Sequence, residues 1–141
     1  MLDFVEAVLQ TGGWITIENP FTSLLFCMPE ILEGIQSGKW NLVYMDQCCH
    51  GLRSPLGVTP QEIWKKPTYF LVTSDCFNQL KVRCQGNHTH TPVLGKVKVF
   101  GKSCARSMLA GRYPELLANR YASCALAHHR LEGYGPDQKS P

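Results

Sequence analysis

Trp14-Ile15-Thr16-Ile17-Glu18-Asn19-Pro20-Phe21 is the stretch of sequence from which the fold is first predicted. Its first four residues are aromatic or β-branched, which favours a buried strand. The proline lacks the amide hydrogen that a strand ladder needs, so we expect the strand to end in the turn Glu18-Asn19-Pro20. A helix over residues 30–36, opened by Pro29, and a second strand over residues 40–45 are predicted to follow.

Helical and extended patterns continue to alternate on both sides of this stretch. Apolar residues at helical spacing predict a first helix that Gly12-Gly13 ends, a third strand over residues 69–73, and a last helix from Pro114 to about Leu131. This alternation predicts an α/β fold, a partial Rossmann-like parallel sheet with flanking helices. We expect one domain over residues 1–131 and a polar tail over residues 132–141.

Length and composition exclude several classes of protein. The chain has 141 residues, of which 44% are hydrophobic, so one domain of this size can bury a core without disulfides. No apolar run approaches the roughly 20 residues of a membrane span, so no membrane association is predicted. The N-terminus lacks the basic region of a secretory signal, which predicts an intracellular protein, nuclear or cytoplasmic, whose seven cysteines stay reduced.

Charge is distributed unevenly along the chain. Residues 1–62 carry two basic and seven acidic side chains, whereas residues 63–141 carry twelve basic and four acidic. No acidic residue lies between Phe77 and Pro114, which indicates nucleic acid as a partner for residues 77–114. The alternative is a solvated surface that the acidic half balances in space. The predicted nucleic-acid contacts are Lys96, Lys98, Lys102 and Arg106.

The turn Glu18-Asn19-Pro20-Phe21 is the first candidate for chemistry. It follows a hydrophobic strand at its carboxyl end, where open α/β sheets place ligands. The Asn19 side chain and a backbone carbonyl would accept both hydrogens of an exocyclic amine. Phe21 would stack on a flipped base, and the Glu18 carboxylate would bond a protonated cytosine edge. The alternative is an ordinary strand-to-helix turn, in which Asn and Pro are common.

The order of segments around this turn resembles the middle of a DNA methyltransferase catalytic domain, over roughly residues 1–122. The segments that carry the resemblance are residues 14–20, residues 42–45 with Asp46-Gln47-Cys48, and residues 65–72. The chain is similar to cytosine-5 methyltransferases and to methyltransferase-like segments of mobile-element polyproteins. The latter share Glu-Asn-Pro, Lys-Pro-Thr and Cys-Gln-Gly-Asn-His-Thr-His in this order.

The resemblance implies a role for each residue of the turn. Glu18 and Asn19 would be the base-contacting pair, and Phe21 would be the stacking residue. Pro20 replaces the valine of the cytosine enzymes, and Asn-Pro-Phe is one proline short of the Asn-Pro-Pro-Phe of amino-methyltransferases.

Two parts of such an enzyme are missing from the sequence. The S-adenosylmethionine loop should follow the first strand, whereas Thr11-Gly12-Gly13 precedes a strand, and no cysteine comes before Cys27 to act as the nucleophile. We therefore expect S-adenosylmethionine to bind only in a longer parent protein, with a complementing N-terminal half as partner.

Cys84-Gln85-Gly86-Asn87-His88-Thr89-His90 predicts a zinc site. Alternate residues of an extended strand face the same side, so His88 and His90 can share an ion while Cys84 reaches back across a turn at Gly86. A structural zinc takes four nitrogen or sulfur ligands. The fourth would be Cys48, Cys49 or Cys76; Cys48 is favoured because it follows a strand at the same sheet edge. The alternative is a polar loop with free cysteines.

The sequence thus leaves two principal classes of function open. The first is a methyltransferase-like DNA-modifying fragment that is inactive alone. The second is a zinc-stabilised nucleic-acid-binding or interaction module without catalysis. A third, a metal-dependent nuclease using His88 and His90, lacks an acidic partner between residues 76 and 114.

Overall fold

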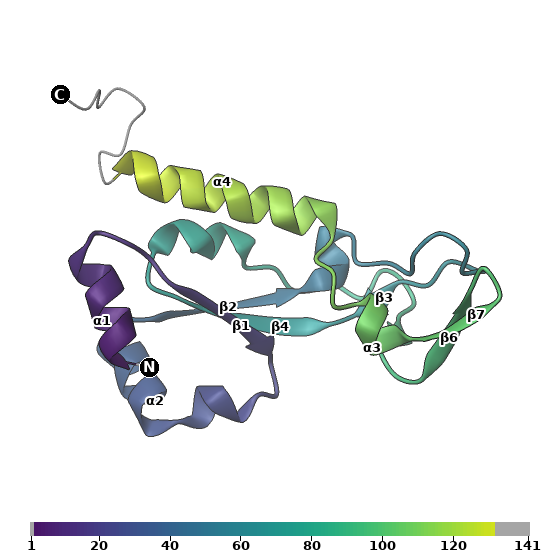
Figure 1. Ribbon diagram of the computed structural model, residues 1–141, viewed down its shortest axis with the longest axis horizontal. Helices are drawn as coiled ribbons and strands as arrows, with labels where there is room; N and C mark the ends of the chain where they lie inside the picture. Colours follow the sequence, from purple (N-terminus) through teal and green to yellow (C-terminus); the bar gives the residue numbers. More distant parts are fainter. Residues whose placement is uncertain (1, 132–141) are drawn as a thin grey trace.

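The computed structural model describes residues 2–131 as a mixed α/β protein (Figure 1). The predicted tail at residues 132–141 lies outside this range. In chain order the elements are α1 (Leu2–Gln10), β1 (Thr16–Pro20), η1 (Leu24–Cys27), α2 (Pro29–Gln36), β2 (Asn41–Asp46), η2 (Gln47–His50), β3 (Trp64–Lys65), β4 (Pro67–Val72), η3 (Asp75–Leu80), β5 (Thr91–Pro92), β6 (Lys96–Val99), β7 (Lys102–Ala105), α3 (Arg106–Leu109) and α4 (Glu115–Leu131). No described helix is long and apolar enough to cross a membrane.

The three predicted strands form one sheet, but their direction differs from the prediction. The sheet order is β1-β4-β2, and β4 runs antiparallel to both neighbours. Asp46 pairs directly with Pro67, so the connection over residues 47–66 starts and ends at the same edge of the sheet. A parallel pairing would need a crossover segment that carries the chain back to the other edge, and this connection contains none. Parallel pairing occurs in the short β3–β5 pair, and the expected partial Rossmann-like parallel sheet is not found among β1, β2 and β4.

Pro20 corrects a second detail of the prediction. We expected the strand to end in a turn at residues 18–20, but Pro20 is still part of β1 and pairs with Thr68. Because β1 lies at the edge of the sheet, the missing amide hydrogen of Pro20 breaks no second ladder. An edge position is where a strand tolerates proline.

Each face of the sheet is covered by helices, and each cover forms its own core. On one face α1, η1 and α2 pack against Leu71 through Val5, Phe26, Ile31 and Trp40. On the other face η3 and α4 pack against Val43, Phe70 and Val72 through Phe77, Leu80, Leu117 and Cys124. Figure 1 shows α4 along one side of the sheet and α1 with α2 along the other. The predicted apolar stripe of the last helix is confirmed, since Leu117 and Cys124 are buried.

The sequence signals for helix ends are also confirmed. Gly12 has a φ of 74°, and the amide of Gly13 donates to the Val8 carbonyl at 3.0 Å, which closes α1. Helix α2 begins at Pro29, and Gly38 beyond its end has a φ of 77°.

A smaller lobe extends from the sheet at the end opposite α1 (Figure 1). It contains the β6–β7 hairpin, the β3–β5 pair and α3 around a third core of Leu52, Trp64 and Ala110. Val97 of β6 packs on this core. The inner face of the hairpin is therefore fixed to the lobe.

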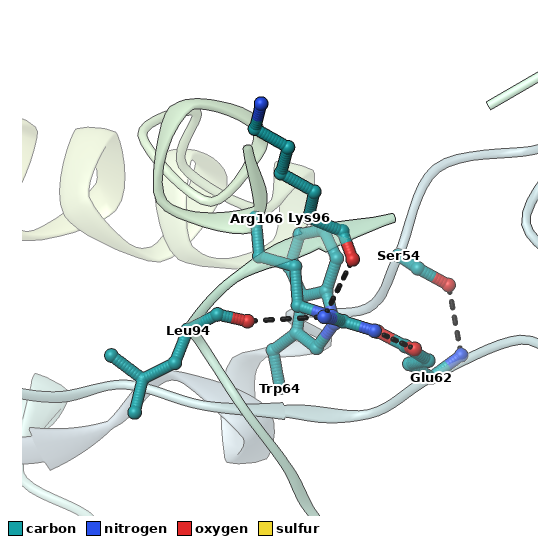
Figure 2. A network of polar contacts seen from close by, with 6 residues as sticks. All are labelled: Ser54, Glu62, Trp64, Leu94, Lys96 and Arg106. Carbon is teal, nitrogen blue, oxygen red and sulfur yellow. Dashed lines mark hydrogen bonds and ion pairs between the residues drawn. The ribbon is translucent and has the colours of Figure 1, made fainter. Parts of the chain in front are cut away.

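A partly buried ion pair holds the base of the hairpin (Figure 2). Arg106 donates to both Glu62 oxygens, at 2.8 Å from Nε and 2.7 Å from Nη2, and its Nη1 donates to the carbonyls of Leu94 and Lys96. The Trp64 indole also donates to Glu62, at 2.6 Å. The Arg106 hydrogen bonds, followed by that of Trp64, lower the pKa of Glu62 from 4.5 to about 2 despite its burial. The structure thus gives Arg106 a structural role, because each of its guanidinium nitrogens already donates to a protein atom. The nucleic-acid contact expected of Arg106 stays a prediction.

Replacing Glu62→Gln should lower the free energy of unfolding by about 2 kcal/mol at pH 7, because a bidentate charged pair loses its charge. The pKa of Glu62 is depressed in the folded protein, so its contribution is complete above about pH 4.5 and is lost as the pH falls toward 2. Urea unfolding of both proteins across this pH range measures the difference.

The matched control is Glu6→Gln, which removes the exposed Lys39–Glu6 pair and should cost less than about 1 kcal/mol. A difference for Glu62→Gln that does not change between pH 7 and pH 2 would contradict the assignment.

Candidate metal centre

Cys48 is placed by the end of β2, as the sequence predicted. The chain leaves the sheet at Asp46, turns through η2 and ends this turn at Gly51, which has a φ of 88°. The buried Gln47 side chain donates to Thr68 of β4 at 3.0 Å. This bond fixes η2 to the sheet and so fixes Cys48 beside its edge.

Cys84 reaches the same edge because the chain after η3 lies along β2. Val82 forms a parallel bridge with Met45. The Val82 amide donates to the Tyr44 carbonyl, and the Asp46 amide donates to the Val82 carbonyl at 3.0 Å. The Cys84 amide then donates to Asp46 Oδ2 at 2.9 Å. Asp46 therefore positions the backbone that carries Cys84.

The turn predicted at Gly86 is present, with a φ of 74°. Its amide lies 3.4 Å from the Cys84 sulfur, an arrangement that stabilises a thiolate. His88 follows, and its Nδ1 lies 2.9 Å from Asn87 Oδ1, where it donates. This tautomer leaves the lone pair of His88 Nε2 free to bind a metal.

His90 is fixed by the strand that follows it. The next residue, Thr91, begins β5, and its amide donates to the Ile63 carbonyl at 2.9 Å. The β3–β5 pair is therefore the rigid element that holds His90 over η2.

These elements bring four ligand atoms together, one from each of Cys48, Cys84, His88 and His90, all within 4.8 Å of one another. The Cys84 sulfur lies 3.5 Å from Nε2 of His88 and 3.5 Å from Nε2 of His90. His90 Nε2 lies 3.3 Å from the Cys48 sulfur and 2.8 Å from His88 Nε2. All four residues are partly buried.

Three of the sulfur–nitrogen distances fit a tetrahedral ion. Bonds of about 2.3 Å to sulfur and 2.0–2.1 Å to nitrogen give tetrahedral edges of roughly 3.3–3.8 Å. These three distances fall in this range, and the two imidazole nitrogens, 2.8 Å apart, would separate by roughly half an ångström around an ion. The remaining pairs lie within 4.8 Å, so they too would adjust on binding. A cation at the centre of these four atoms would accept a lone pair from each of them.

Two residues of the cluster have shifted pKa values. Burial, then the neighbouring Cys84 and Cys49, raise the pKa of Cys48 to about 12. Burial, then His88 and Lys65, lower the pKa of His90, so this ring is neutral at pH 7. A metal would displace the thiol protons, because the thiolate is the form that binds.

The structure separates the residues of the other predicted site. Glu18 lies on the α4 face of β1, and Asn19, one residue on, lies on the α1–α2 face. Phe21 is 47% exposed, with its ring centre 6.1 Å from that of Tyr69, and Pro20 is exposed at the edge.

Glu18 borders a cavity of about 440 Å³ beneath α4, with Phe70, Tyr113 and Tyr121 in its wall. Its buried Oε1 accepts no hydrogen bond; Lys66 Nζ is an ion-pair partner at 3.8 Å. Burial and the Glu18 carboxylate raise the pKa of Tyr113 to about 12.

Three of the four predicted basic contacts lie on the β6–β7 hairpin. Lys96 and Lys98 are two residues apart, so both lie on the outer face of β6. Lys102 is the first residue of β7. All three lysines are exposed.

Sequence reasoning missed two supporting residues of the metal cluster. Asp46 accepts from the Cys84 amide through one oxygen and from the Tyr44 hydroxyl through the other, at 2.9 Å each. Asn87 orients His88. The sequence did carry signals for both residues: Asp46 is an acidic residue at the end of a strand, and Asn87 is an amide residue next to His88.

No protein family, curated protein or solved structure matches this chain. The functional argument therefore depends on the geometry of these sites.

We predict that the purified protein binds about one zinc per chain, which elemental analysis measures. Chelation should lower the Tm, because metal binding contributes directly to folding. Cys84→Ser should abolish stoichiometric zinc, since it removes the ligand that contacts both histidines.

Cys27→Ser is the matched control, because Cys27 is an exposed cysteine outside the cluster. It should keep one zinc and an unchanged Tm. Equal zinc content in the two variants would place the metal elsewhere.

Proposed function

We propose that the chain is a zinc-stabilised nucleic-acid-binding module. The observation that carries this proposal is the convergence of Cys48, Cys84, His88 and His90 at the end of β2. A zinc ion with two cysteine and two histidine ligands has no open position, which is typical of a structural site.

The position of the metal supports a link to nucleic acid. His90 leads directly into β5, and the chain then enters the β6–β7 hairpin with its three exposed lysines. The Glu62–Arg106 pair fixes the base of the hairpin. A metal that orders residues 83–94 would thereby hold a cationic element in one orientation.

The charge around the hairpin supports an anionic partner. Residues 77–114 and residues 47–61 contain no acidic side chain. Exposed lysines in such surroundings attract phosphates and release counterions on binding.

A methyltransferase-like role for the Glu18–Phe21 turn is the second candidate. The cavity beside Glu18 favours it, because an unbonded carboxylate oxygen in an aromatic wall suits a base with a donor group. A base in this cavity would not meet Asn19 or Phe21, which are on the other side of β1. We therefore rank this role below the zinc module.

The nuclease alternative receives less support. Asp46 lies beside the cluster and supplies the acidic group missing from residues 76–114. Both of its oxygens already accept hydrogen bonds, and four protein ligands leave no place for a metal-bound water.

Binding of the protein to a labelled oligonucleotide should weaken steeply with salt. Lys98→Glu should weaken binding. The slope of log K against log salt should become shallower by about the value for one lost phosphate contact, or more. Fluorescence anisotropy over a salt series measures both quantities.

Arg130→Glu is the matched control, because it reverses one exposed charge at the far end of α4, away from the hairpin. It should change binding little. Salt-independent affinity, or equal losses in the two variants, would refute electrostatic binding by the hairpin.

A further inference from the structure

The tip of the β6–β7 hairpin carries an unusual residue. Val99 and Lys102 form the last pair, so the turn consists of Phe100 and Gly101. Their φ angles are 48° and 80°, and two positive angles characterise a type I′ turn, in which Asn-Gly is preferred. A bulky residue at positive φ is a genuine outlier, and within residues 2–131 Phe100 is the one non-glycine residue with such an angle. Strain of this kind is often retained for function.

Packing does not explain the aromatic ring. Phe100 is 80% exposed and lies outside the core of the small lobe, to which Val97 of the same strand contributes. The ring rests against Gly57, where an added Cβ would lie 2.9 Å from two ring carbons. The neighbouring Leu56 is 82% exposed. The ring is thus supported from one side and open on the rest of its surface.

The charges beside this ring are of one sign. Lys98 lies two residues before Phe100 and Lys102 two residues after it, and both are exposed. Because Lys102 pairs with Val99, the two lysines lie on opposite faces of the hairpin, one on each side of its tip. The acidic residue of the lobe, Glu62, is already neutralised by Arg106. An exposed aromatic ring between cations matches the parts of a single-strand binding site, in which bases stack on aromatics while cations follow the backbone.

We propose that Phe100 stacks on an unpaired base of single-stranded nucleic acid, while Lys98 and Lys102 contact its phosphates. This inference rests on the proposed nucleic-acid function and adds the strandedness and the contact residue. A duplex keeps its bases stacked inside, so the ring finds a partner face only on a single strand. The affinity should therefore be higher for single strands than for a duplex of the same sequence.

The test uses anisotropy of the zinc-loaded chain with labelled dT12, rU12 and a 12-base-pair duplex. Phe100→Asn removes the ring and installs a residue that the turn prefers, so the variant should fold at least as stably as the wild type. Its affinity for dT12 or rU12 should fall roughly 5- to 150-fold, the range for loss of one stacked base, with an unchanged salt slope. Phe100→Trp should retain the affinity.

The outcomes separate this inference from the function on which it depends. Equal binding of dT12 and rU12 by wild type and Phe100→Asn, with salt dependence intact, would overturn the stacking role and leave the nucleic-acid function standing. No nucleic-acid binding by the wild type would overturn both. Phe100-dependent binding to vesicles of phosphatidylserine and phosphatidylcholine, without binding to the oligonucleotides, would assign the tip to a membrane surface and contradict the proposal.

Discussion

The convergence of Cys48, Cys84, His88 and His90 is the constraint on which the rest of the account depends. Two segments without long helices or strands, residues 47–66 and 83–94, meet at this point. Leu52 and Trp64 anchor the first segment in the third core, and Val93 of the second segment packs on the same core. A metal would add order to the cysteine and histidine residues that lie outside that core. The cluster also explains why polar, cysteine-containing loops lie beside the edge of a well-packed sheet.

The small lobe has two fixed points in addition to its own core. A metal bound at the cluster would hold the strand that leads into the lobe, and the Glu62–Arg106 pair holds the base of its hairpin (Figure 2). Both lie within one connected region, because β3 pairs with β5 and Trp64 donates to Glu62. A hairpin fixed in this way presents its lysines and Phe100 without further support from the large sheet. This arrangement suits a binding element better than a catalytic one.

The sequence was most informative where a single local signal determines the result. Pro29, Gly12 and the apolar stripe of α4 predicted helix ends and a buried face correctly, since each acts within a few residues. The convergence of Cys84, His88 and His90 was also predictable, because the turn at Gly86 brings the chain back, and Cys48 was the favoured one of three candidates for the fourth residue. Strand direction was not, because it depends on where the connection over residues 47–66 returns, a long-range property. The role of Arg106 was hidden for the same reason: its partner Glu62 lies 44 residues away.

The nature of the metal site is tested most directly by X-ray absorption spectroscopy at the zinc edge of the zinc-loaded chain. The account predicts four ligands, two sulfurs at about 2.3 Å and two nitrogens at about 2.0–2.1 Å with imidazole scattering. Loss of one sulfur in Cys48→Ser and no change in Cys49→Ser would assign the fourth ligand. A first shell of oxygen and nitrogen alone, or one with a bound water in place of Cys48, would contradict the structural zinc centre described above.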